Sequence, residues 1–231
     1  MSIQEAVDVL DNPVWHALTS YHAQFALGSG FARRYSPDIA PFVALANPSP
    51  AAFADLAQIV DSGERLVLRG FELPPDLPGW VIHTRKLIVQ MICDEPQPEI
   101  ASAEAILTLT EADVPDMLAL VELAKPGPFL SRTIQLGTYL GIRRDGQLIA
   151  LAGERMHIPG FCEISAVCTH PDQRGKGYAR LLITRLMAQQ RERGEVPILH
   201  VMPENTNAQR VYESLGFRKR RDLPYVALSR E

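Results

Sequence analysis

The stretch CEISAVCTHPDQRGKGYARLLITRLMAQQRERGEVPILHVMPENTNAQRVYESLGF, residues 162–217, decides the fold. Its apolar run 164–169 predicts a strand, and from Tyr178 onward leucines recur at helical spacing. Between them, residues 174–179 form a glycine-rich turn that also carries an arginine and a lysine. The first N–H groups of a helix lack intrahelical partners, and the helix dipole is positive there. The stretch therefore predicts a phosphate-binding site at a strand–helix junction.

Two well-known phosphate loops do not match this turn. The P-loop pattern G-x-x-x-x-G-K-[ST] does not occur in the sequence, and the dinucleotide pattern G-x-G-x-x-G would need glycine where the chain has Arg180. A tight turn with packing glycines is the simpler alternative. However, Gly175 and Gly177 together with two cations are more than a turn requires.

The turn RGKGYA, residues 174–179, instead matches the R/Q-x-x-G-x-G/A signature of the GNAT superfamily of acyl-CoA-dependent N-acyltransferases, which this segment strongly resembles. A second element, NTNAQRVYESLGF at 205–217, is similar to the N-x-x-A-x-x-x-Y-x-x-x-G-F element of that family, with its Asn and Ala closer together. The resemblance covers roughly the last half of the chain, from near Ala103.

The resemblance implies a fold of the α/β (α+β) class. It predicts a mixed, mostly antiparallel sheet flanked by helices, with two central strands that splay apart. The sequence agrees locally, because 138–143 and 147–157 alternate as strands around an Asp-Gly hairpin turn at Asp145. Thr110 and Asp113 predict a capping box at the start of a helix.

The polar, proline-containing run 94–99 predicts a domain boundary. We therefore expect a smaller N-terminal α/β domain over residues 1–100 and a GNAT acetyltransferase domain over residues 101–231. The first could be a degenerate half of the same fold, as in glycine N-acyltransferase-like members, although it has no recognisable phosphate loop. In it we expect a helix from 13 to 27 with Leu18, Tyr21 and Phe25 inward.

Composition limits the function classes. The net charge of −4 over 231 residues argues against a nucleic-acid partner. Three cysteines without a CxxC or metal-ligand spacing suggest reduced thiols and no metal site. The N-terminal sequence has no basic, apolar leader and no segment reaches membrane-spanning length, so we expect a cytoplasmic protein without a membrane partner. A homodimer is left open.

The resemblance implies an N-acetyltransferase that passes the acetyl group of acetyl-CoA to a primary amine by direct attack in a ternary complex. The alternative is a non-catalytic CoA-binding regulatory or interaction protein. The apolar rim expected around 126–129 and Tyr139 favours a small amine, an amino acid or a peptide amine as acceptor. The cofactor residues that follow from the resemblance are Ala166, Val167, Thr169, Arg174, Gly175, Lys176, Gly177, Tyr178, Ala179, Asn205 and Asn207.

Two catalytic residues are predicted. Tyr212 matches the tyrosine that the family uses to protonate the leaving thiolate, although it could instead only pack between helix and sheet. Glu163 lies where some members place a glutamate base, or it could be a strand-end residue paired with Arg155.

Other candidates carry weaker signals. Glu154 and His157 are secondary base candidates more typical of surface or hairpin residues, and Cys168 is an unfavoured nucleophile. Asn207 or Thr206 could simply cap the helix that follows.

Overall fold

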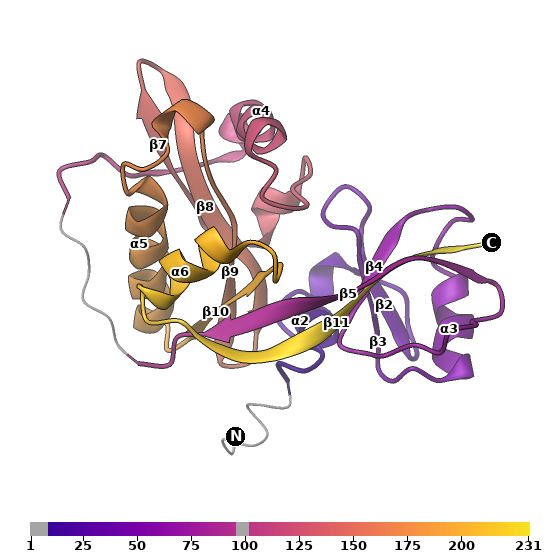
Figure 1. Cartoon of the computed structure of the whole chain (residues 1–231). Coiled ribbons are helices and arrows are strands. Elements are labelled where there is room, and N and C mark those ends of the chain that lie inside the picture. The colour runs from indigo at the N-terminus through magenta and orange to yellow at the C-terminus, as the bar shows by residue number, and fades with distance from the viewer. Residues whose placement is uncertain (1–8, 96–101) are drawn as a thin grey trace.

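The computed structural model describes residues 9–95 and 102–231, which form one mixed sheet of eleven strands in the order β1-β2-β3-β4-β11-β5-β10-β9-β8-β7-β6 (Figure 1). The strands are β1 (Ala26–Leu27), β2 (Ala32–Tyr35), β3 (Phe42–Leu45), β4 (Leu66–Arg69), β5 (Trp80–Ile92), β6 (Leu107–Thr108), β7 (Tyr139–Arg144), β8 (Gln147–Ile158), β9 (Phe161–Thr169), β10 (Val196–Val201) and β11 (Arg218–Arg230). The α-helices are α2 (Pro13–Leu18), α3 (Pro50–Ala57), α4 (Val114–Ala124), α5 (Tyr178–Glu192) and α6 (Thr206–Glu213). Short 3₁₀ turns cover Ala23–Phe25, Glu111–Asp113, Thr133–Leu136 and Pro171–Gln173.

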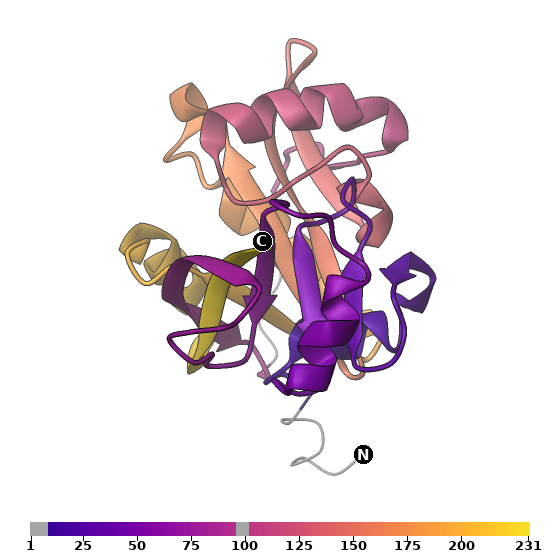
Figure 2. The same cartoon turned by 90° about the vertical axis from the view of Figure 1, so that its right-hand side faces the viewer.

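The two longest strands join the early and late parts of the chain. β5 and β11 pair antiparallel almost throughout, and in Figure 1 they run side by side from the α5 side of the molecule to the α3 side. β5 also pairs with β10, so a strand from the first hundred residues lies inside the sheet of the last hundred. Figure 2 shows the N-terminal strands and α3 in front of the later strands.

A separate N-terminal domain is not confirmed, because the sheet is continuous through both parts. Most of the predicted boundary run 94–99, and the division between residues 100 and 101, lie outside the described residues. The division into 1–100 and 101–231 and the likeness of the first part to half of the fold stay predictions.

Helices α4 and α5 pack on opposite faces of β8 and β9 (Figure 1). On α5, Leu182 and Leu186 are fully buried, as the helical spacing of its leucines predicts. No helix in the described part of the chain has the length and apolar character needed to cross a membrane.

The predicted hairpin turn and the predicted capping box are both confirmed at the residue level. The β7–β8 hairpin turns at Asp145 and Gly146, both with positive φ (49° and 80°), the backbone of the Asp-Gly turn that the sequence predicts. At the start of the 3₁₀ turn before α4, the Asp113 carboxylate accepts the backbone N–H of Thr110 at 2.8 Å.

The predicted helix 13–27 is wrong beyond Leu18. The chain leaves α2 there, and Tyr21 is 58% exposed instead of facing inward. The hydroxyls of Thr19 and Ser20 donate to the carbonyls of Trp15 and His16. Such hydrogen bonds from Ser and Thr side chains compete with the helical backbone ladder, which accounts for the early end.

Candidate active site

Strands β9 and β10 separate partway along their length. Their parallel pairing covers only Phe161–Glu163 against Val196–Ile198, while both strands continue beyond it. A cavity of about 550 Å³ lies past the last pair, lined by β9, β10, α5, α6 and the segment after α4. The position matches the gap that the family resemblance implies.

A β-bulge on β9 shapes the wall of this cavity. The register against β8 shifts between Leu151 and Gly153, and Ala166 on the opposite strand has φ of 53°. A left-handed conformation is unfavourable for alanine and is most common at turns and functional sites. The bulge interrupts the ladder at the point where β9 borders the cavity.

The glycine-rich turn forms the other end of the site. Gly175 and Gly177 have φ of 76° and 83°, Gly177 is the N-cap of α5, and the space around both Cα atoms is open. The first intrahelical bond runs from Leu181 N to Gly177 O at 3.1 Å, so the earlier N–H groups have no acceptor within the helix. Arg174, the first residue of this turn, lines the cavity.

Most of the predicted site residues meet at the cavity. Its wall includes Ala166, Val167, Thr169, Arg174, Ala179, Asn205 and Tyr212. Gly175, Lys176, Gly177 and Tyr178 form the turn that joins two of these, Arg174 and Ala179. Asn207 is exposed on α6 and does not line the cavity.

The capping prediction for Thr206 or Asn207 is wrong by one or two residues. Asn205 caps α6, and its side-chain oxygen accepts from Ala208 N at 3.2 Å. Asn205 therefore combines the capping role with a place on the cavity wall.

Tyr212 projects from α6 to the cavity and its ring packs edge-on against Phe217, with ring centres 6.2 Å apart. Burial raises the pKa of Tyr212 to about 12, so the phenol keeps its proton at neutral pH. A protonated phenol is the form that a general acid requires.

Glu163 lies beneath the cavity, fully buried. Its carboxylate accepts from Arg155 Nε at 2.7 Å and from Arg155 Nη2 at 2.6 Å, and it also contacts His200 Nδ1 at 2.7 Å. Burial alone would raise the pKa of Glu163, but the charges and hydrogen bonds of Arg155 and His200 hold it well below its usual range. The alternative pairing with Arg155 is therefore present, and it makes Glu163 a weak proton acceptor. Its role as a base stays a prediction, one that these contacts disfavour.

The hydrogen bonds around Gln90 define the tautomer of His200. Gln90 Oε1 accepts from Arg220 at 2.7 Å, so its NH₂ group is the one that faces Leu10 O at 2.9 Å and His200 Nε2 at 3.0 Å. His200 Nε2 therefore accepts, and Nδ1–H donates to Glu163. Burial lowers the pKa of His200 against the pull of Glu163, consistent with a neutral ring.

Two arginines at this end of the cavity were not predicted as site residues. Arg155 comes from β8 and Arg69 from β4, in the early part of the chain, and both line the cavity although they are only 6% and 3% exposed. The available sequence signal was a charged residue beside apolar strand residues: Arg69 is the last residue of β4, and Arg155 lies inside β8.

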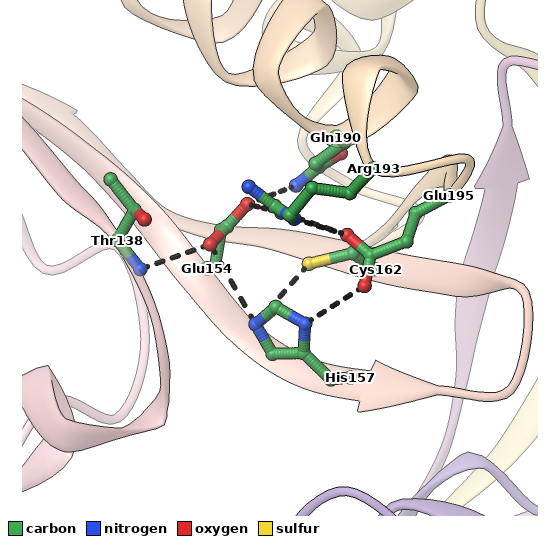
Figure 3. Close-up of polar contacts among 7 residues, drawn as sticks. All are labelled: Thr138, Glu154, His157, Cys162, Gln190, Arg193 and Glu195. Atoms are coloured by element: carbon green, nitrogen blue, oxygen red, sulfur yellow. Dashed lines mark hydrogen bonds and ion pairs between the residues drawn. The ribbon is translucent and has the colours of Figure 1, made fainter.

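A second polar cluster lies between β8 and the end of α5 (Figure 3). His157 Nδ1 is 3.1 Å from Glu195 Oε1, and its Nε2 is 3.7 Å from Cys162 Sγ. Glu154 lies on β8 of the β7–β8 hairpin and is 1% exposed, so of the two alternatives, surface or hairpin, the surface position is wrong. Its carboxylate accepts from Thr138 N at 2.9 Å, Gln190 Nε2 at 3.1 Å and Arg193 Nη2 at 2.5 Å.

Within this cluster, Glu154, His157 and Cys162 each offer one potential ligand atom, all within 4.8 Å of one another, although the sequence predicts no metal site. Three protein ligands are the usual number in catalytic zinc sites. Here, however, the carboxylate of Glu154 already has three donors, and one of them is the cation of Arg193. We therefore interpret the cluster as a network that fastens β8 to α5.

Comparison with known proteins places this geometry among related folds. A family model described as FR47-like protein matches residues 139–226. A solved structure of a GNAT-family protein from Novosphingobium aromaticivorans is 39% identical with a TM-score of 0.88, covering 96% of this chain and 98% of that chain. No match was found among curated proteins.

Two more distant structures share the fold. A GCN5-related N-acetyltransferase from Kribbella flavida has a TM-score of 0.57 at 18% identity, covering 92% of this chain and 95% of that chain. A GCN5-related N-acetyltransferase-like protein from Streptococcus suis has a TM-score of 0.58 at 15% identity, covering 98% of both chains.

Proposed function

Because the chain belongs to the GNAT family of acetyltransferases, we propose that it transfers the acetyl group of acetyl-CoA to a primary amine, by direct attack in a ternary complex. The observation that carries this proposal is the cavity between the diverging strands β9 and β10. It joins the glycine-rich turn at one end to Tyr212 and the bulge at Ala166. These are the parts that must hold a diphosphate, an extended thioester arm and a leaving thiolate.

Each part of the coenzyme has a suitable partner. The free N–H groups at the start of α5, with Arg174 and Lys176, would hold the diphosphate. Backbone groups of β9 that β10 does not pair would bind the amides of the pantetheine arm, with Asn205 on the cavity wall as a further amide partner. At the bulge around Ala166 the strand pairing is interrupted. A backbone N–H there would donate to the thioester oxygen, where negative charge develops.

The contacts of Glu163 favour a positioning role over a role as base. Its carboxylate holds Arg155 and the neutral tautomer of His200. Nε2, the acceptor nitrogen of the neutral His200 ring, already accepts a hydrogen bond from the Gln90 amide. We therefore propose that the acceptor ammonium loses its proton to water in the cavity before attack, and that Tyr212 protonates the departing thiolate.

A route through an acylated cysteine has little support. Cys168 lines the cavity, but burial raises the pKa of its thiol to about 12. Since the thiolate is the nucleophilic form, very little of it exists at neutral pH. Direct attack by the amine remains the simpler path.

Release of free thiol from acetyl-CoA in the presence of a panel of amines tests the proposal. We expect thiol release that depends on the amine and formation of the matching N-acetyl product by mass spectrometry. The alternative function, a CoA-binding regulatory protein, predicts thermal stabilisation by CoA without thiol release for any amine. That result would overturn the proposed activity while leaving the CoA site in place.

Tyr212→Phe is expected to lower kcat by about 100-fold, the lower end of what a positioned general acid contributes. Only the hydroxyl is removed, so the packing against Phe217 and the affinity for acetyl-CoA should change little. Steady-state kinetics together with calorimetric titration of acetyl-CoA would measure both. A kcat equal to that of the wild type would exclude the acid role.

A further inference from the structure

The end of the cavity away from the glycine-rich turn holds more positive than negative charge. Arg69 and Arg155 both line it, and Glu163 is the one carboxylate that the structure shows paired with them. Arg155 takes both oxygens of Glu163 in a bidentate pair. Because His200 is neutral, two guanidinium groups share one carboxylate in a buried setting.

Of the two arginines, Arg69 is the one whose charge lacks a close carboxylate partner. Its Nη1 lies 3.7 Å from Glu163 Oε1, which is too long for a hydrogen bond. Within the described residues, Nε and Nη1 of Arg69 are buried without a hydrogen-bond partner. Burial, followed by the charge of Arg155, lowers the pKa of Arg69 to about 10, so the group stays charged at neutral pH in an unfavourable environment.

Aromatic rings hold the Arg69 guanidinium by its face. Its central carbon lies 4.4 Å from the ring centre of Phe42 and 5.8 Å from that of Tyr225. Stacking fixes the plane of the guanidinium but uses none of its N–H groups. The side chain is therefore oriented in advance, with donors left over at its edge.

The order of residues along β9 shows where Arg69 lies relative to the glycine-rich turn and the bulge. Thr169 lies next to the glycine-rich turn, the bulge at Ala166 lies in the middle, and Glu163 lies under the arginines. A ligand that reached Arg69 would thus sit beyond the thioester from the coenzyme's diphosphate. That is the place for the acceptor.

We propose that Arg69, supported by Arg155, binds the carboxylate of the acceptor, and that the acceptor is therefore a free amino acid. This inference rests on the proposed acetyltransferase function and narrows it. A planar carboxylate matches the fork of a guanidinium, and its charge supplies the second negative charge that this end of the cavity lacks. The early part of the chain, through β4, then contributes directly to acceptor choice.

The test compares matched triplets under the same acetyl-CoA concentration: an amino acid, its primary amide and the decarboxylated amine, for a set of side-chain sizes. We expect kcat/KM for the best amino acid to exceed that of its amide and its amine by about 100-fold, the size expected for one charge-assisted pair. If amides or decarboxylated amines turn over as well as the amino acids, the carboxylate site is refuted while the acetyltransferase activity stands.

Arg69→Met removes the cation but keeps much of the apolar stem. The variant should fold, because it leaves a one-to-one pair of Arg155 and Glu163. We expect KM for the amino acid to rise by about 100-fold, turnover of the decarboxylated amine to persist, and the affinity for acetyl-CoA to remain unchanged. The matched control is Arg33→Met, since Arg33 is a partly buried arginine that stacks on Trp15 and does not line the cavity.

A binding measurement keeps the proposal testable if turnover is absent. N-acetyl amino acids and their amides are titrated into the wild-type protein saturated with CoA. Tighter binding of at least one acid than of its amide, lost in Arg69→Met and retained in Arg33→Met, supports the site. Equal binding of acids and amides, or no binding of any acid, overturns it.

Discussion

Glu163→Gln is expected to lower the free energy of unfolding by about 3 kcal/mol, the lower end of the cost of breaking a buried ion pair by removing one partner. The substitution leaves Arg155 and Arg69 buried together without a carboxylate, and it also weakens the hydrogen bond to His200. Urea denaturation at pH 7 would measure the change. Glu64→Gln is the matched control, because its partner Arg34 is buried but Glu64 itself is 23% exposed, and a smaller loss is expected.

The pH dependence of stability gives a second readout for Glu163. Its pKa in the folded protein lies below the value of 4.5 expected for the unfolded chain. Its contribution is therefore fully present above the unfolded pKa and is lost as the pH falls through the folded value. The wild type should lose stability below about pH 4.5 more steeply than Glu163→Gln.

The same variant separates the two roles considered for this residue. A base would produce an acidic limb in the pH profile of kcat/KM that disappears in Glu163→Gln. A positioning residue would leave the shape of that profile intact while stability falls. Wild-type stability combined with a lost acidic limb would restore Glu163 as the base.

Local patterns were sufficient to predict the glycine-rich end of the cavity. The turn at 174–179, the leucine spacing of α5 and the Asp-Gly hairpin at Asp145 depend on neighbours within a few residues, and the structure has all of them as predicted. Tyr212 and Asn205 follow from the motif at 205–217, and both line the cavity. Helical periodicity and short motifs with local hydrogen bonds are the features that can be predicted most directly from a sequence.

The end of the cavity at Arg69 could not be predicted in the same way. Arg69 reaches the cavity because β4 pairs with β11, β11 with β5, and β5 with β10, a set of contacts between segments far apart in the chain. For Glu163, strand pairing predicted Arg155 as a possible partner, which the structure has, but it gave no indication of His200 or Arg69. The cluster around Glu154 was missed for the same reason, since Thr138, Gln190 and Arg193 come from separate elements.

Gly177→Trp is expected to weaken CoA binding by about 1,000-fold, the loss expected if about three charge-assisted hydrogen bonds are removed. In the present structure a Cβ at Gly177 meets nothing within 4 Å, and Gly177 N-caps the helix whose free N–H groups are proposed to hold the diphosphate. An indole there would occupy the space where the phosphates would lie. Isothermal titration of CoA would measure the change.

The control for this variant lies at the other end of the same helix. Gly194 follows α5, has φ of 75° against 83° for Gly177, and likewise has open space around its Cα atom. Gly194→Trp therefore imposes a similar backbone strain and a similar apolar surface without touching the turn. If Gly194→Trp retains wild-type affinity while Gly177→Trp loses it, the loss arises from the turn and not from strain. Equal affinity of Gly177→Trp and the wild type would contradict the assignment of the diphosphate to this turn.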